Sequence, residues 1–202
     1  MPSVIFLFTK PVRNALKSLP ILAFLLLGCE EQYSKQDALN QSRHCLEIKN
    51  DLGGLSNERN PYFLLIAANI ENQLKVNDSI IFAVDRISRE IDEKNLLYFE
   101  ALLAVKSKHK DSRFIDATLE FIRTNQNLES KTYELVKSLL DSERNKEVEK
   151  KIIEDLRSAA KKMIEVQSNF LAEESKFHND NGITQNEVDS IVRIIKNKKS
   201  KH

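Results

Sequence analysis

The chain has 202 residues, of which 41% are apolar and 30% are charged. This balance is typical of a globular protein with one core, and it excludes disorder throughout the chain. The formal charge is only +1 at pH 7, which argues against the broad phosphate-neutralising surface that binds nucleic acid. We therefore expect no nucleic acid among the partners.

The first 28 residues have the order of a secretory signal peptide. Their three charged side chains are all basic, an apolar run follows over residues 19–27, and no acidic residue occurs before Glu30. This run is shorter than the roughly 20 residues that cross a bilayer, and Pro20 discourages one continuous helix. The pattern predicts a cleaved leader in preference to a retained transmembrane helix.

Leu26, Leu27, Gly28 and Cys29 resemble the lipobox of bacterial lipoproteins, in which a small residue precedes the cysteine. The resemblance covers only the leader. It implies cleavage before Cys29 and attachment of a diacylglycerol and an N-acyl chain to that cysteine, and several acyl chains hold a protein at a membrane more firmly than one. Glu30, in place of the aspartate that retains many enteric lipoproteins in the inner membrane, implies the outer membrane facing the periplasm if the source is Gram-negative.

Removal of the leader leaves 28 basic and 30 acidic side chains, and a formal charge of −2. Lipidation of Cys29 would leave Cys45 as the one thiol of the mature chain. Cys45 is expected to be a small buried apolar residue, with pairing between two molecules as the alternative. His44 points about 100° away around a helix, so the two residues do not form a catalytic dyad.

The sequence predicts an all-α fold, an elongated bundle of long, coiled-coil-like helices after the signal peptide. We expect a signal peptide over residues 1–28, a lipidated N-terminus and short tether over 29–33, the bundle over 34–197 and a basic tail over 198–202. Glycine and proline are scarce after the leader, which favours long helices.

The first helix is predicted over residues 34–52, with its end at Gly53 and Gly54. Residues 53–60 read as a polar turn. Asn60 and Pro61 form a cap followed by a proline at the first helical position, so the second helix is predicted to begin there.

A seven-residue spacing of apolar side chains from Pro61 to about Ser107 predicts that second helix. Unbroken, it would be about 70 Å long. Asn77 occupies one core position of the series, where it could fix register, lie partly exposed, or mark a break at residues 77–79. The series comprises Phe63, Ile70, Asn77, Val84, Ile91, Tyr98 and Val105, with Ile66, Leu74, Ile80, Ile81, Ile87 and Leu102 beside it.

A second seven-residue series fails at Ser142 and Glu149 and then resumes in the same frame. Residues 112–178 could therefore form one very long helix, or a hairpin whose second helix is capped by Asn145. The series comprises Phe114, Phe121, Leu128 and Leu135, then Leu156, Met163, Phe170 and Phe177.

The last helix has the clearest boundaries. Asn181 and Gly182 close the preceding helix, and Thr184 with Glu187 matches a capping box, with Ile183 and Val188 as a hydrophobic staple. Its apolar face either docks on the bundle or, with the lysines that follow, lies on an anionic membrane. That face comprises Val188, Ile191, Val192 and Ile195.

No pattern in the chain predicts catalysis. The four histidines, His44, His109, His178 and His202, lack metal-ligand spacing, and no phosphate loop or nucleophile motif occurs. Glu174 and His178 are four apart on one helical face, and we expect an ordinary solvent-facing pair. The sequence therefore predicts no enzyme, no metal site and no cofactor besides the lipid.

We expect a membrane-anchored helical lipoprotein that acts by contact with an unidentified envelope protein, in assembly, in immunity or exclusion, or as a spacer. Association with a second copy of the chain stays open. The alternative is a periplasmic module for a lipid or small molecule, which a cavity lined by Phe121, Met163 and Phe170 would support. A metal-dependent hydrolase would require clustered carboxylates or histidines in a cleft.

Overall fold

The computed structural model describes residues 33–106, 112–141, 143 and 145–199. The chain divides into two units, residues 1–34 and 35–202; of the first, only Tyr33 and Ser34 are described. Five helices and no strand occur in the described ranges, which confirms the all-α fold. They are α2 (Lys35–Glu71), α3 (Asp78–Lys106), α4 (Arg113–Leu140), α5 (Lys146–Asp180) and α6 (Gln185–Lys199).

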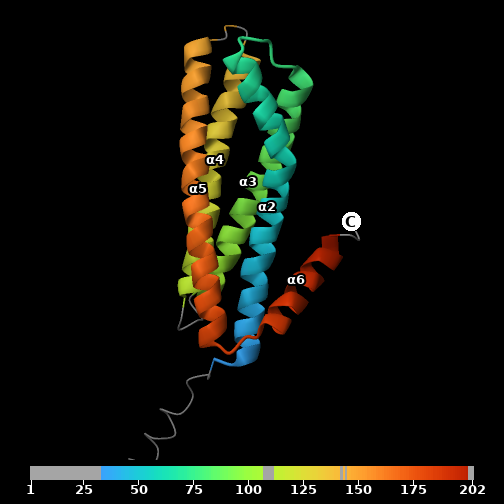
Figure 1. The fold of residues 1–202 in the computed structure, drawn as a ribbon, viewed down its shortest axis with the longest axis vertical. Helices are drawn as coiled ribbons and strands as arrows, with labels where there is room; N and C mark the ends of the chain where they lie inside the picture. The colour runs from blue at the N-terminus through green and yellow to red at the C-terminus, as the bar shows by residue number, and fades with distance from the viewer. Residues whose placement is uncertain (1–32, 107–111, 142, 144, 200–202) are drawn as a thin grey trace, which may run out of the picture. The chain divides into compact units, whose positions relative to one another are not determined.

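The second unit is an elongated bundle of four long helices, α2 to α5, that run side by side (Figure 1). Successive helices are joined by short connections and run antiparallel. Helix α4 packs closely against α5 and α3, and α2 packs closely against α3, whereas α2 and α5 share far fewer contacts. Among neighbouring helices of the four, α2 and α5 are therefore the most loosely packed.

Helix α2 continues through Gly53, Gly54 and Pro61, so the predicted end at residue 52 and the predicted start at Pro61 are both wrong. The local cost is about 1 kcal/mol for each glycine and about 3 kcal/mol for the proline. Packing outweighs it because Leu52 and Ile66, on either side of the interruption, are both fully buried. Pro61 itself is exposed.

The sequence left open whether the helix is interrupted near Asn77, and the structure contains this interruption. Residues 72–77 connect α2 to α3, and Gln73 adopts a left-handed backbone with φ of 59°. The side chain of Asn77 is exposed, and its Oδ1 accepts hydrogen bonds from the backbone N and the Oγ of Ser79, each 2.9 Å long. Asn77 is therefore a helix cap and not a core residue.

Helices α4 and α5 form the hairpin, not the single long helix. Asn145 caps α5, because its side chain accepts from the backbone N–H groups of Glu147 and Val148. The ring of Phe114 lies 5.2 Å from that of Phe170 and 5.3 Å from that of Phe177. The two halves of the seven-residue series thus pack against each other across the hairpin.

The predicted boundary of α6 is confirmed. Gly182 has a φ of +63°, and Glu187 accepts from the backbone N and Oγ1 of Thr184 at 2.8 and 2.9 Å. These hydrogen bonds lower the pKa of Glu187 to about 2, with help from Lys35. The capping box forms as the sequence indicated.

Helix α6 leaves the end of α5 and runs beside α2 (Figure 1). Ile191 and Ile195 are buried, and an ion pair of 2.7 Å joins Lys198 to Glu47 of α2. In the structure, α6 therefore docks on the bundle through its apolar face. In the part of the chain that the structure describes, no helix has the length and apolarity to cross a membrane.

Candidate functional site

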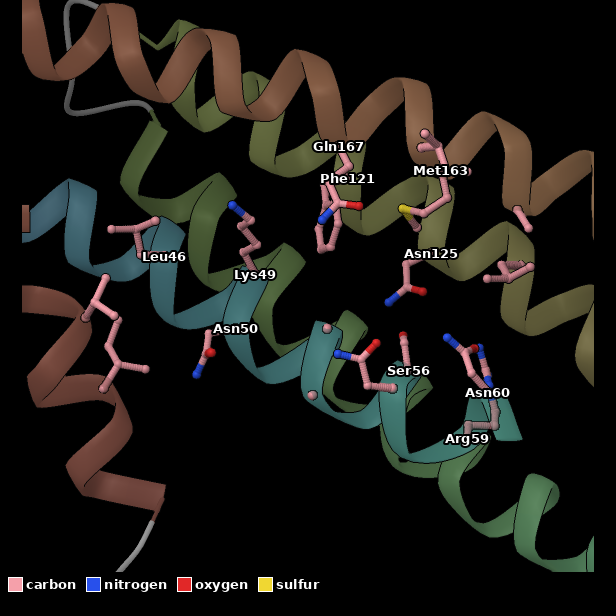
Figure 2. A pocket seen from close by; sticks show the side chains of 18 residues that line it. Leu46, Lys49, Asn50, Ser56, Arg59, Asn60, Phe121, Asn125, Met163 and Gln167 are labelled. Atoms are coloured by element: carbon pink, nitrogen blue, oxygen red, sulfur yellow. The ribbon is translucent and has the colours of Figure 1, made fainter. Parts of the chain in front are cut away.

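A groove of about 630 Å³ opens along the loose seam between α2 and α5. In Figure 2, Lys49, Ser56 and Arg59 extend from α2 on one side, Met163 from α5 on the other, and Asn125 from α4 between them. Helix α6 contributes to one edge of the groove through Val192 and Ile195.

Small residues make the middle part of the α2 wall. Gly53, Gly54 and Ser56 all line the groove, and a Cβ atom added at Gly53 would meet no atom within 4 Å. No described part of the chain therefore requires Gly53 to be glycine, although glycine weakens a helix. The small residues widen the space between α2 and α5.

Arg59 lines one end of the groove and is almost completely buried, at 1% exposure. Its Nη1 donates to Oγ of Ser88 at 3.0 Å and to a carboxylate oxygen of Glu129, and its guanidinium lies 4.9 Å from the ring centre of Phe63. Burial raises the pKa of Glu129, and Arg59 opposes that rise. The Nε of Arg59 has no hydrogen-bond partner among the described residues.

A pair of buried amides adds to the buried polar groups around Arg59, Ser88 and Glu129. Asn125, which lines the groove, donates to Oδ1 of Asn95 at 3.3 Å, and both side chains are at most 1% exposed. Buried polar groups are normally paired, because each one left unpaired costs about 1 to 3 kcal/mol. The Nδ2 of Asn95 and Oε1 of Glu129 nevertheless have no partner within the described ranges.

Lys49 supplies a second cation to the groove. Its Nζ lies 3.8 Å from Oε2 of Glu174 and 4.9 Å from the ring centre of Phe170. Burial raises the pKa of Glu174, against the effect of Lys49. Glu174 and Glu129 do not line the groove, whereas Lys49 and Arg59 do. The ionisable side chains that face this space are therefore cationic.

The expectation of a solvent-facing Glu174 and His178 is wrong. His178 is only 8% exposed, and its Nε2 lies 2.7 Å from Oγ of Ser42. A serine beside a histidine is the start of a nucleophile and base pair, but Ser42 is 0% exposed and does not line the groove, so its hydroxyl faces no space that could hold a substrate there. Burial lowers the pKa of His178, which favours a neutral, structural histidine.

Cys45 is buried and free, as predicted. Burial raises the pKa of its thiol to about 12, and a hydrogen bond with Thr118 only partly offsets this effect. The thiolate is the nucleophilic form of cysteine, so Cys45 is unreactive in the folded chain. His44 is exposed.

No group of three or more histidine, cysteine, aspartate or glutamate side chains suited to a metal ion occurs within residues 33–106, 112–141, 143 and 145–199. His109 and His202 lie outside the described residues. So do Leu26, Leu27, Gly28 and Cys29 of the lipobox.

The cavity residues named from the sequence are partly brought together. Phe121 and Met163 line the groove, whereas Phe170 is 0% exposed and belongs to the core. Sequence reasoning missed Arg59 and Asn125. Arg59 fell in the predicted polar turn, and Asn125 lies in the predicted helix with no feature that marks it as buried.

No protein-family model, curated protein or solved structure matches the chain.

Proposed function

We propose that the chain is a lipoprotein, cleaved before Cys29 and held at a cell membrane by lipid on that cysteine, with the outer membrane as its site in a Gram-negative source. The bundle acts by contact with another protein of the cell envelope, in assembly, in immunity or exclusion, or as a spacer. It needs no enzyme chemistry and no cofactor besides the anchor.

The observation that carries this proposal is an apolar stripe on the outside of α3. Phe82, Leu96 and Leu103 are 58%, 55% and 44% exposed, and their numbers differ by multiples of seven. Residues spaced by sevens share one face of a helix. The stripe extends over about 30 Å at 1.5 Å per residue.

Arg89 interrupts the stripe between Phe82 and Leu96, and an aromatic side chain of α4 lies beside it. Arg89 lies on the same seven-residue spacing, pairs with Asp85 at 3.0 Å, and stands over the ring of Tyr133 of α4 at 5.8 Å. Tyr133 is 53% exposed. Aromatic and arginine side chains are enriched at protein interfaces. An amphipathic helix that carries a carboxylate opposite Arg89 fits this surface.

Crosslinking in living cells tests the proposal. A photo-crosslinking amino acid at Leu96 is expected to capture one specific envelope protein, and the same amino acid at Glu154, exposed on α5, is the matched control. The doubly substituted chain Phe82→Ser with Leu103→Ser should lose the adduct. Equal adducts from both positions, or adducts only with a second copy of the chain, would refute an envelope partner.

The anchor has an independent test. Cys29→Ser should abolish incorporation of labelled fatty acid and release the protein from the membrane fraction. A labelled, membrane-bound Cys29→Ser chain would exclude lipidation at this cysteine.

The groove between α2 and α5 favours a second function, binding of a lipid or small molecule. Its volume of about 630 Å³ is within the range of ligand pockets, about 300 to 1,000 Å³. Native mass spectrometry of the purified chain should find a bound small molecule that Gly53→Phe excludes. A ligand retained by that variant would place the binding elsewhere.

A further inference from the structure

We infer that the groove between α2 and α5 binds an anionic amphiphile, a molecule with a carboxylate or similar acidic head and an apolar body, and that Arg59 receives the head. This inference rests on the second proposed function and specifies its ligand class. Four observations support it, and each concerns a different property of the groove.

The first is the unused donor of Arg59. This side chain is 1% exposed, its Nη1 is occupied by Ser88 and Glu129, and its Nε has no partner among the described residues. A buried N–H group without an acceptor is costly. Arg59 lines the groove but its Nε is covered, so an acidic oxygen that enters beside Arg59 becomes this acceptor after a small shift of the side chains over it, in a charge-assisted hydrogen bond.

The second is the sign of the charge. Lys49 and Arg59 are the ionisable side chains that line the groove, and their partners Glu174 and Glu129 are not among its lining residues. An anion that enters therefore meets cations before it meets carboxylates. The groove disfavours an ammonium head for the same reason, since such a head would approach two positive charges.

The third is the apolar surface beyond Arg59. Leu128, Met163 and Ile164 line the groove, and Ile164 is 66% exposed at its mouth. Covering such surface with an apolar ligand body contributes about 25 cal/mol for each Å² removed from water. The far end is bordered by Leu46 of α2 and Ile195 of α6. The body of the ligand lies along this wall.

The fourth is the glycine wall. The open space at the Cβ position of Gly53 is not filled by any described side chain, although a larger residue there would suit the helix better. A ligand against the backbone of α2 uses that space. Helix residues 46 to 60 extend over about 20 Å, so the groove accepts an elongated molecule.

Competition between charged amphiphiles tests the inference. The probe is the anionic dye 8-anilinonaphthalene-1-sulfonate, measured by fluorescence with the full chain. Dodecanoate should displace it at about tenfold lower concentration than dodecyltrimethylammonium, because one charge-assisted hydrogen bond favours the acid. Equal displacement by the two detergents would overturn the acidic preference.

Variants locate the binding in the groove. Gly53→Phe should weaken dye binding about tenfold or more by filling the space beside α2. Ala68→Phe, which adds the same ring at an exposed position of α2 outside the groove, should leave it unchanged. Each variant is compared with the unmodified chain, because dye bound outside the groove contributes equally to both measurements.

Arg59 is tested without leaving a lone buried charge. The paired variant Arg59→Met with Glu129→Met removes both ions together, and it should still bind the neutral dye Nile red but lose the preference for dodecanoate. A preference that survives would overturn the role of Arg59.

Different results would contradict small-molecule binding in the groove and the acidic nature of the ligand. Nile red bound by the unmodified chain and excluded by Gly53→Phe, with no preference for dodecanoate, would leave small-molecule binding standing and overturn the anionic ligand. Dyes unaffected by Gly53→Phe would overturn both.

Discussion

Replacement of Gly53 by alanine should stabilise the bundle. Gly53 lies inside α2 with no positive φ, and the added Cβ meets no atom within 4 Å, so the substitution carries no steric cost. Alanine is favoured over glycine in a helix interior by about 0.5 to 1 kcal/mol. For a domain of this size, that gain raises the Tm by about 1 to 4 °C.

Thermal and urea unfolding followed by circular dichroism at 222 nm would measure the change. Gly182→Ala is the matched control. Gly182 has a φ of +63°, where an alanine costs about 1 to 2 kcal/mol, so this variant should lose stability by that amount. A destabilised Gly53→Ala chain would show that residue 53 lies in a turn, and it would refute the continuous α2.

Three further outcomes follow from buried and capping side chains. Arg59→Met should cost about 3 to 5 kcal/mol in urea unfolding, since it leaves the Glu129 carboxylate buried alone, and Glu129→Met added to it should recover most of the loss. Burial lowers the pKa of His178, so the unfolded chain binds a proton on this imidazole at a higher pH than the folded chain does. The stability due to neutral His178 is therefore present above about pH 6.5 and is lost as the pH falls from that value to the lower pKa of the folded chain. His178→Gln should flatten this part of the profile of stability against pH. Asn145→Ala should cost about 1 kcal/mol, because two backbone N–H groups of α5 lose their acceptor.

Each of these has a contradicting result. If Arg59→Met and the paired variant unfolded at the same urea concentration, the ion pair would not be the source of the loss. An unchanged pH profile in His178→Gln would assign the acid sensitivity to other groups. An Asn145→Ala chain as stable as the original would mean that water replaces the cap at no cost.

Local chemistry explains which parts of the fold the sequence predicted. The cap at Asn145 and the capping box of Thr184 and Glu187 depend on residues at most three positions apart, and such patterns are visible in a sequence. The burial of Cys45 followed from its place in an apolar face. These predictions required no knowledge of distant partners.

The errors have the opposite cause. Gly53 and Pro61 are strong local helix breakers, and the packing of Leu52 and Ile66 against other helices overrides them. Arg59 reads as a solvated side chain because its partner Glu129 is 70 positions away. His178 reads as exposed because Ser42 is 136 positions away. The groove is lined by residues of four helices, α2, α4, α5 and α6, so no one segment indicates it.

The ion pair of Arg59 with Glu129 also bears on which register the helices adopt. Apolar side chains repeat every seven residues in α4, so a slide of α4 by one repeat along α2 would place apolar groups against apolar groups again. The same slide would move Glu129 about 10 Å from Arg59 and leave both buried charges without a partner. We expect this one buried ion pair to select a single alignment of α4 and α2 from several that would all bury the apolar repeat.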